Sequence, residues 1–271
     1  MQHYKTLSVA LRDGVAHIEL DRPGKANALD GTMWQELREV FIKLDATPEA
    51  RVCILNGRGK HFCAGIDLQF LIEIKNKAGQ WPEGQKEERL HHIIVELQEA
   101  VNAVENCRKP VLAAAHGACL GAGVDLISAC DMRYASSDAR FSIKEVDLAI
   151  VADLGTLQRL PSLIGEGRTR ELAYSGREFD GQQACDMGLI NKLFPNRSGL
   201  LQGVMALAAE ISKKSPLTIR GIKETLNFSR NHTIAEGLSF VATRNAAMLL
   251  SKDLEEAISA QVQKRTPKFE N

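Results

Sequence analysis

The first half of the chain alternates short apolar runs with longer segments of helical periodicity, and this alternation restricts the fold more than any other feature. The apolar runs, rich in β-branched residues, occupy residues 4–10, 15–20, 51–55 and 110–115. Apolar residues recur at helical spacing after Asp30, a plausible cap, and again from Leu90 to Val104. Strands that alternate with helices predict βαβ units, and therefore an α/β domain.

The chain changes character after about residue 156. Strand signals nearly vanish there, apart from residues 188–194, and four segments are predicted to be helices: 200–212, 215–228, 232–250 and 252–264. We therefore predict an α/β core over residues 1–195 and a helical C-terminal region over residues 196–271. The charged stretch at 74–88, which contains Gly and Pro, is predicted to be a mobile loop.

Charge and cysteine content exclude several classes of protein. Lys plus Arg and Asp plus Glu both total 34, so the bulk charge favours neither nucleic acid nor an anionic membrane as a partner. No apolar run approaches the roughly 20 residues of a membrane span. The six cysteines lack CxxC spacing and indicate reduced core thiols. Neither chain end resembles a signal, transit or peroxisomal sequence, so we expect a cytoplasmic protein.

Two glycine-bearing turns could supply backbone hydrogen-bond donors. Residues 117–126, GACLGAGVDL, place small residues between a strand and a helical run, and Ala64 to Asp67 repeat the arrangement after another strand. The first N–H groups of a helix have no intrahelical partner and lie at the positive end of its dipole. Ala122 is thus well placed to donate its N–H to an oxyanion. Small-residue turns are more often only turns, so this signal is weak alone.

Residues 141–161, FSIKEVDLAIVADLGTLQRLP, place Glu145, Asp147 and Asp153 among residues typical of a protein interior. A buried carboxylate without a partner costs several kcal/mol, or else it takes up a proton. Such acids indicate either satisfied structural pairs or chemistry. Taken alone, Asp153 favours a helix cap, because residues 154–157 open a helical run. We interpret Asp147 as a structural or surface residue.

The sequence resembles the crotonase superfamily, also called the enoyl-CoA hydratase/isomerase family. The resemblance is carried in order by RPGKANALD at 22–30, GKHFCAGIDL at 59–68, HGACLGAGVDLISACDMRYA at 116–135, the acid-bearing stretch above, and GLINKLFP at 188–195. It implies an α/β fold, a crotonase-like spiral of ββα units with a helical C-terminal region that carries trimer contacts, often in dimers of trimers. It also implies an acyl-CoA substrate without a redox cofactor or a metal.

The same resemblance assigns binding residues. The two oxyanion donors would be the backbone N–H groups of Ile66 and Ala122, and Ala122 departs from the glycine usual there. The residues implied to contact the coenzyme A thioester are Lys25, Ala26, Ala28, Ala64, Gly65, Asp67 and Leu68. Asp67 is also expected to stabilise its turn. Lys264 and Arg265 are further candidates for the phosphates of coenzyme A.

The trio Asp125, Glu145 and Asp153 looks like that of the Δ3,5-Δ2,4-dienoyl-CoA isomerases of this family, whereas typical hydratases carry two glutamates and a glycine at these positions. Moving two conjugated double bonds requires removal of a proton at carbon 2 and its return at carbon 6, and one carboxylate cannot reach both positions without moving. By resemblance, Glu145 accepts the proton from carbon 2, Asp153 supplies one at carbon 6, and Asp125 tunes the site electrostatically.

Several alternatives stay open at this point. The scaffold also suits a 2-enoyl-CoA hydratase, or a 3-enoyl-CoA isomerase that uses Glu145 alone. A catalytically silent protein that only binds acyl-CoA is a further possibility. Asp131 is expected to anchor a loop, and His116 and Cys119 are expected to be core residues, since no third group orients them as a nucleophilic pair.

Overall fold

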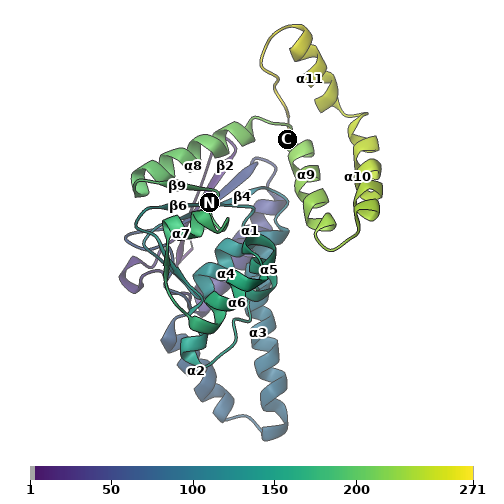
Figure 1. Cartoon of the computed structure of the whole chain (residues 1–271). Helices are drawn as coiled ribbons and strands as arrows, with labels where there is room; N and C mark the ends of the chain where they lie inside the picture. The colour runs from purple at the N-terminus through teal and green to yellow at the C-terminus, as the bar shows by residue number, and fades with distance from the viewer. Residues whose placement is uncertain (1–3, 271) are drawn as a thin grey trace.

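A computed structural model describes residues 4–270 and contains a six-stranded sheet in the order β1-β2-β3-β4-β6-β9 (Figure 1). Its strands are β1 (Leu7–Arg12), β2 (Val15–Leu20), β3 (Val52–Gly57), β4 (Val111–Ala115), β6 (Met132–Ser136) and β9 (Lys192–Phe194). β1 and β2 pair antiparallel, and the other neighbours pair parallel. β1 and β2 form a hairpin whose two turn residues, Asp13 and Gly14, both have positive φ, as a type I′ turn requires.

A second, smaller sheet contains β5 (Ala118–Leu120), β7 (Arg140–Ser142) and β8 (Phe179–Asp180). β4 passes into β5 through His116 and Gly117, and β6 passes into β7 within a few residues. Successive turns of the chain therefore place one strand in each sheet, which is the predicted spiral. The backbone turns at these crossings bring the ends of different strands together, and they position the candidate site.

Helices pack around the two sheets. The helices of the spiral are α1 (Gly31–Ala46), α2 (Leu68–Gly79), α3 (Glu83–Asn106), α4 (Ala122–Ala129), α5 (Thr156–Ile164), α6 (Glu166–Ser175) and α7 (Gly181–Asp186). The predicted cap of α1 is confirmed, since the Asp30 carboxylate accepts a hydrogen bond of 2.9 Å from the Met33 N–H. Short 3-10 helices cover Pro23–Lys25 and Lys144–Leu148.

The central strands of the large sheet are buried on both faces, as in most parallel sheets. Along β3, Cys53 and Leu55 join the main core, while Val52 and Ile54 point to the other face. Helix α8 (Arg197–Ser212) covers that other face with Leu200, Val204 and Ala208. The continuous apolar runs of β3 and β4 thus belong to strands that have no solvent-facing side, whereas β1 at the edge of the sheet is mostly half-buried.

The C-terminal helices α9 (Pro216–Ser229), α10 (Ile234–Met248) and α11 (Lys252–Val262) project from the body of the protein (Figure 1). This confirms the four predicted C-terminal helices, of which α8 lies against the sheet. The division of the chain at residue 195 and the assembly role of the helices stay predictions. Among residues 4–270, no helix is both long and apolar enough to cross a membrane.

The predicted mobile loop over residues 74–88 is wrong. Helices α2 and α3 cover most of it, and only residues 80–82 lie between them. The charged side chains form solvated helix faces, as in the Glu83–Lys86 ion pair at 2.6 Å. Pro82 stands at the N-cap of α3, where a missing N–H costs no hydrogen bond. Gly and Pro here mark helix ends and not a loop.

A substitution at Gly117 tests whether the crossing between the two sheets tolerates a side chain. It has a φ of +54°, and a Cβ there would lie 2.1 Å from the Lys60 carbonyl oxygen. We expect Gly117→Ala to lower the free energy of unfolding in urea by about 2–4 kcal/mol, from left-handed strain and the clash. The control is Gly84→Ala in α3, where a Cβ would meet nothing within 4 Å. Equal stabilities of the two variants would contradict this account.

Candidate active site

Two loops meet where the sequence predicts backbone donors. An ideal Cβ on Gly65 would lie 3.1 Å from the Leu120 carbonyl oxygen and 3.8 Å from the Ala122 nitrogen. Isolated bridges join Leu29 to Ile66 and Cys63 to Cys119. The fold therefore brings the turn at 64–67 against the start of α4, although 56 residues separate Ile66 from Ala122 in the sequence.

Both predicted donors are free of backbone acceptors. In the part of the chain that the structure describes, no backbone hydrogen bond engages the Ile66 N–H. Ala122 is the first residue of α4, where an N–H has no intrahelical acceptor. Its helical conformation also accommodates the methyl group that replaces the usual glycine. The two N–H groups are thus available to an oxyanion, and their assignment to substrate stays a prediction.

The candidate coenzyme A segments lie side by side. The Ala64 N–H donates to the Ala26 carbonyl at 3.0 Å, and the Leu29 N–H donates to the Gly65 carbonyl at 2.8 Å. Buried Asn27 fastens this turn, because its amide donates to the Arg58 and His61 carbonyls and accepts from the Arg22 N–H. Within this region Lys25 and Leu68 are exposed, whereas Ala26, Ala28 and Ala64 are half-buried and Gly65 is buried.

Asp67 has the expected turn-stabilising role. Its carboxylate accepts from the Gln69 N–H at 2.9 Å, capping α2, and pairs with Arg22 at 3.0 Å. Arg22 was not singled out from the sequence, and it also pairs with Asp30. At the other end of the chain, Arg265 is committed to a two-point ion pair with Glu256.

The three acids come from three different parts of the fold, and Asp153 lies in the connection between the 3-10 helix Lys144–Leu148 and α5. Asp125, on α4, is buried, with one carboxylate oxygen 2.7 Å from the Thr156 N–H and the other without a partner. Glu145, on the 3-10 helix after β7, has a buried oxygen that also lacks a partner. A Cβ on Gly121 would lie 3.3 Å from Glu145 Oε1, so this carboxyl lies beside the start of α4.

Asp153 is not the cap of α5. The N-cap of that helix is Gly155, with no side-chain cap, and the first helical N–H, that of Thr156, is bound by Asp125. Asp153 is exposed and borders a polar cavity of about 420 Å³. The capping role in α5 expected of Asp153 is therefore filled by Asp125, from α4.

The acids influence one another. Burial, followed by repulsion from Asp125 and Asp153, raises the pKa of Glu145 to about 7. Burial raises the pKa of Asp125 to about 6, against the opposing hydrogen bond from Thr156. Burial also raises the pKa of Asp153. The three carboxyls therefore form one electrostatic group, in which Asp125 and Glu145 have neutral and ionised forms that coexist near neutral pH.

The other acids and the cysteines behave as structural residues. Asp131 accepts from the Val111 N–H and pairs with Lys223, each at 2.7 Å, and thus anchors its loop as expected. Asp147 is exposed and pairs with Lys144 at 3.2 Å. His116 and Cys119 are both buried, and all six cysteines are free, as predicted. Among residues 4–270, no cluster of His, Cys, Asp or Glu is arranged to hold a metal ion.

Large apolar side chains stand exposed in the segments that follow the donor Ile66 and the acid Glu145. Leu68 and Ile72, one turn apart on α2, are both 56% exposed. The segment that joins Glu145 to Asp153 exposes four more: Val146, Leu148, Ile150 and Val151. Such a surface next to polar groups is typical of a binding site.

The half-buried acid Glu145 should lower the free energy of unfolding in a pH-dependent way. Its pKa in the fold lies above the ordinary value of 4.5, so stability is lost as pH rises from about 4.5 through about 7. We expect Glu145→Gln to raise the free energy of unfolding by about 1–3 kcal/mol at about pH 8 and to leave it nearly unchanged at about pH 4. Urea unfolding measures this, with exposed Asp147→Asn as control; a gain that is independent of pH would refute the assignment.

Comparison with known proteins shows the family of this chain. Residues 10–271 match the family model described as enoyl-CoA hydratase/isomerase. The chain is 50% identical to the peroxisomal Delta(3,5)-Delta(2,4)-dienoyl-CoA isomerase of Arabidopsis thaliana, over 99% of this chain and 98% of that one. It is 41% identical to the human mitochondrial protein of the same name, over 97% of this chain and 80% of that one.

A solved structure is similar as well. The crystal structure of an enoyl-CoA hydratase from Bacillus anthracis superposes with a TM-score of 0.89 at 31% identity, covering 98% of this chain and 99% of that one. The names of the two relatives refer to peroxisomes and mitochondria, so the cytoplasmic location stays a prediction. The family model, the identities and the shared fold agree that this chain belongs to the enoyl-CoA hydratase/isomerase family.

Proposed function

We propose that this enzyme converts a 3,5-dienoyl-CoA into the 2,4-dienoyl-CoA. The observation that carries the proposal is the presence of three mutually interacting carboxyls, Asp125, Glu145 and Asp153, beside two free backbone donors. Relatives at 50% and 41% identity over nearly the whole chain are named for this activity. A third acid has no evident use in hydration, whereas a proton shift between distant carbons needs two acids besides the oxyanion donors.

The reaction would begin with the thioester carbonyl oxygen between the Ile66 and Ala122 N–H groups. Loss of a proton at carbon 2 makes this oxygen the negative end of a conjugated dienolate. Two preorganised donors stabilise that charge, and each contributes about 3 kcal/mol in comparable oxyanion holes. The α4 dipole adds to this, since the Ala122 N–H lies at its positive end.

Two carboxyls would then divide the proton transfers. Ionised Glu145 takes the proton from carbon 2, and neutral Asp153 donates one to carbon 6. The substrate thus loses one proton and gains one proton. A raised pKa makes Glu145 a stronger base, and burial shifts the pKa of Asp153 in the direction that favours the protonated donor. An acyl chain that covers exposed Asp153 would raise its pKa further by removing water. We propose that these steps need no redox cofactor and no metal ion.

The geometry of Asp125 argues against hydration. A hydratase would use the acids at positions 125 and 145 together to hold one water molecule. Here the Thr156 N–H occupies one Asp125 oxygen at 2.7 Å, so only one oxygen of this carboxylate is left to hold a water molecule. We propose that Asp125 tunes the charge of the pair and fixes α5, and does not bind the attacking water of a hydratase.

We further propose that the enzyme works as a trimer or a dimer of trimers through its C-terminal helices. In α9 to α11 the large apolar side chains that stand exposed are Ile222, Leu226, Ile234, Leu238, Ile258 and Val262. Exposed apolar residues on projecting helices are typical of subunit interfaces. The apolar surface beside the acids would be covered in the same assembly, which would complete the acyl pocket.

The substrate test uses the wild-type protein with a 3,5-dienoyl-CoA and, separately, a 2-enoyl-CoA. We expect the ultraviolet absorbance of the conjugated 2,4-dienoyl thioester to grow, with slow or absent hydration of the enoyl compound. Rapid loss of enoyl absorbance without a dienoyl product would support the hydratase instead. Thermal stabilisation by acyl-CoA without turnover of either compound would support a protein that only binds.

The second test removes the proton donor. We expect Asp153→Asn to slow dienoyl isomerisation at least about 100-fold, the scale of a positioned acid, while acyl-CoA affinity changes little. Steady-state kinetics and calorimetric binding separate the two quantities. Asp147→Asn is the matched control, because it removes a nearby exposed acid. Full activity of the Asp153 variant would refute the assigned role.

A further inference from the structure

One face of α3 carries three polar side chains, Gln98, Asn102 and Glu105. Their spacings of four and three residues place them on one side of the helix. All three bind the segment from Asp153 to Arg159, which carries the proposed proton donor at one end. The sequence offers no signal for this, because the partners are about 55 residues apart.

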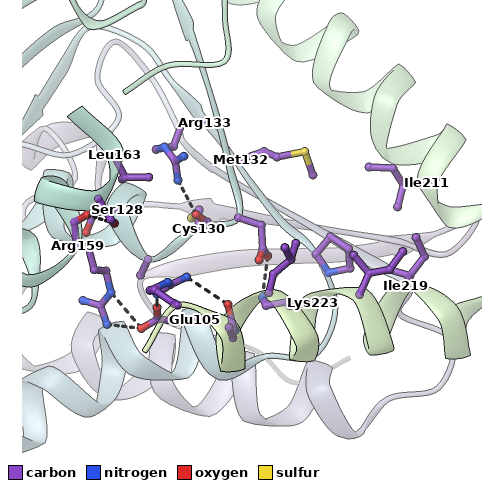
Figure 2. A pocket seen from close by; sticks show the side chains of 18 residues that line it. Glu105, Ser128, Cys130, Met132, Arg133, Arg159, Leu163, Ile211, Ile219 and Lys223 are labelled. Atoms are coloured by element: carbon purple, nitrogen blue, oxygen red, sulfur yellow. Dashed lines mark hydrogen bonds and ion pairs between the residues drawn. The ribbon is translucent and has the colours of Figure 1, made fainter. Parts of the chain in front are cut away.

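The contacts hold both ends of that segment. Gln98 Nε2 donates to the Asp153 carbonyl oxygen at 2.7 Å. Arg159 Nη2 donates to Asn102 Oδ1 at 2.9 Å, and its Nη2 and Nε donate to Glu105 Oε2 at 2.6 and 3.0 Å. Figure 2 shows Arg159 reaching Glu105 with two nitrogens. The Arg159 and Glu105 side chains are only 11% and 20% exposed, so water screens this pair weakly.

The Arg159 guanidinium also folds back over its own turn. Its Nη1 lies 3.3 Å from the Leu154 carbonyl oxygen, and a Cβ on Gly155 would lie 1.7 Å from that nitrogen. Gly155 itself has a φ of +120°. The turn between Asp153 and α5 is therefore shaped around Arg159, and it accepts no side chain at its centre.

The Asp153 carboxyl depends on this backbone for its position. In the described part of the chain, no other side chain forms a hydrogen bond with it; its partner is its own N–H. A proton donor has to come within about 2.6–3.2 Å of the carbon it serves, and a misplacement of about 1 Å can cost about 100-fold in rate. The interactions that fix the turn between Asp153 and α5 therefore also fix the position of the Asp153 carboxyl.

We propose that Arg159, held by Glu105 and Asn102, is a positioning residue that places Asp153 at carbon 6, and that Gln98 completes this clamp from the same face of α3. The proposal rests on the proposed function, since it concerns the second of the two proton transfers. It does not involve the first transfer, which belongs to Glu145 and the backbone donors on other elements. The two half-reactions should therefore respond differently when the clamp is loosened.

The experiment measures both half-reactions in deuterated water. Removal of the proton at carbon 2 is followed as deuterium incorporation into recovered 3,5-dienoyl-CoA by mass spectrometry, and complete turnover is followed as dienoyl absorbance. For Arg159→Lys, which keeps the charge but loses the planar fork, we expect turnover to fall about 10- to 100-fold while exchange at carbon 2 persists. Gln98→Ala should act in the same sense, by about 10-fold.

Arg230→Gln is the matched control. Arg230 binds the same Glu105 from the end of α9, and among residues 4–270 no hydrogen bond joins its side chain to the Asp153 turn, so its loss should leave both rates as in the wild type. Thermal unfolding checks that each variant is folded, and the half-buried Gln98 gives a variant that does not disturb the ion pair. A parallel fall of exchange and turnover in both clamp variants, or no fall in either, would overturn the proposal. A wild-type protein that fails to isomerise would instead refute the proposed function.

Discussion

The hydrogen bond from the Thr156 N–H to the Asp125 carboxylate joins the two halves of the candidate site. It is 2.7 Å long and fully buried, and it ties the helix that starts with Ala122 to the turn that follows Asp153. An unpaired carboxylate in this position would cost several kcal/mol, and so would an unpaired helix-start N–H. The bond satisfies the Thr156 N–H and one of the two Asp125 oxygens, and it fixes the distance between α4 and the turn that follows Asp153.

The surrounding packing makes such an exact pairing possible. The central strands of the large sheet are buried on both faces, and its strands end where the chain crosses into the small sheet at turns such as Gly117. Side chains in a close-packed interior have little freedom to move, so groups on different strands and helices keep fixed separations. The Asn27 amide and the Arg22–Asp67 pair do the same for the loops, because each joins segments that are distant in the sequence.

The same site lowers the stability of the fold. Asp125 and Glu145 both have buried carboxylate oxygens without partners, and burial and mutual repulsion raise their pKa values. Packing elsewhere in the core offsets this loss of stability. In return, the site contains two carboxyls that can each be neutral or ionised near neutral pH. The polar clamp from α3 fits this picture, since it adds order to the one acid that packing leaves exposed.

Local sequence patterns alone determined the hairpin turn at Asp13 and Gly14, the Asp30 cap and the C-terminal helices, because these depend on neighbouring residues. The ordered motifs also pointed to the family and to the three acids. Local patterns failed where a distant partner decides: residues 74–88 form helices, and the cap expected from Asp153 comes from Asp125. The clamp of Arg159 by Glu105 was invisible for the same reason. Only the tertiary structure pairs such groups, since burial, and not sequence distance, determines which polar atoms must find one another.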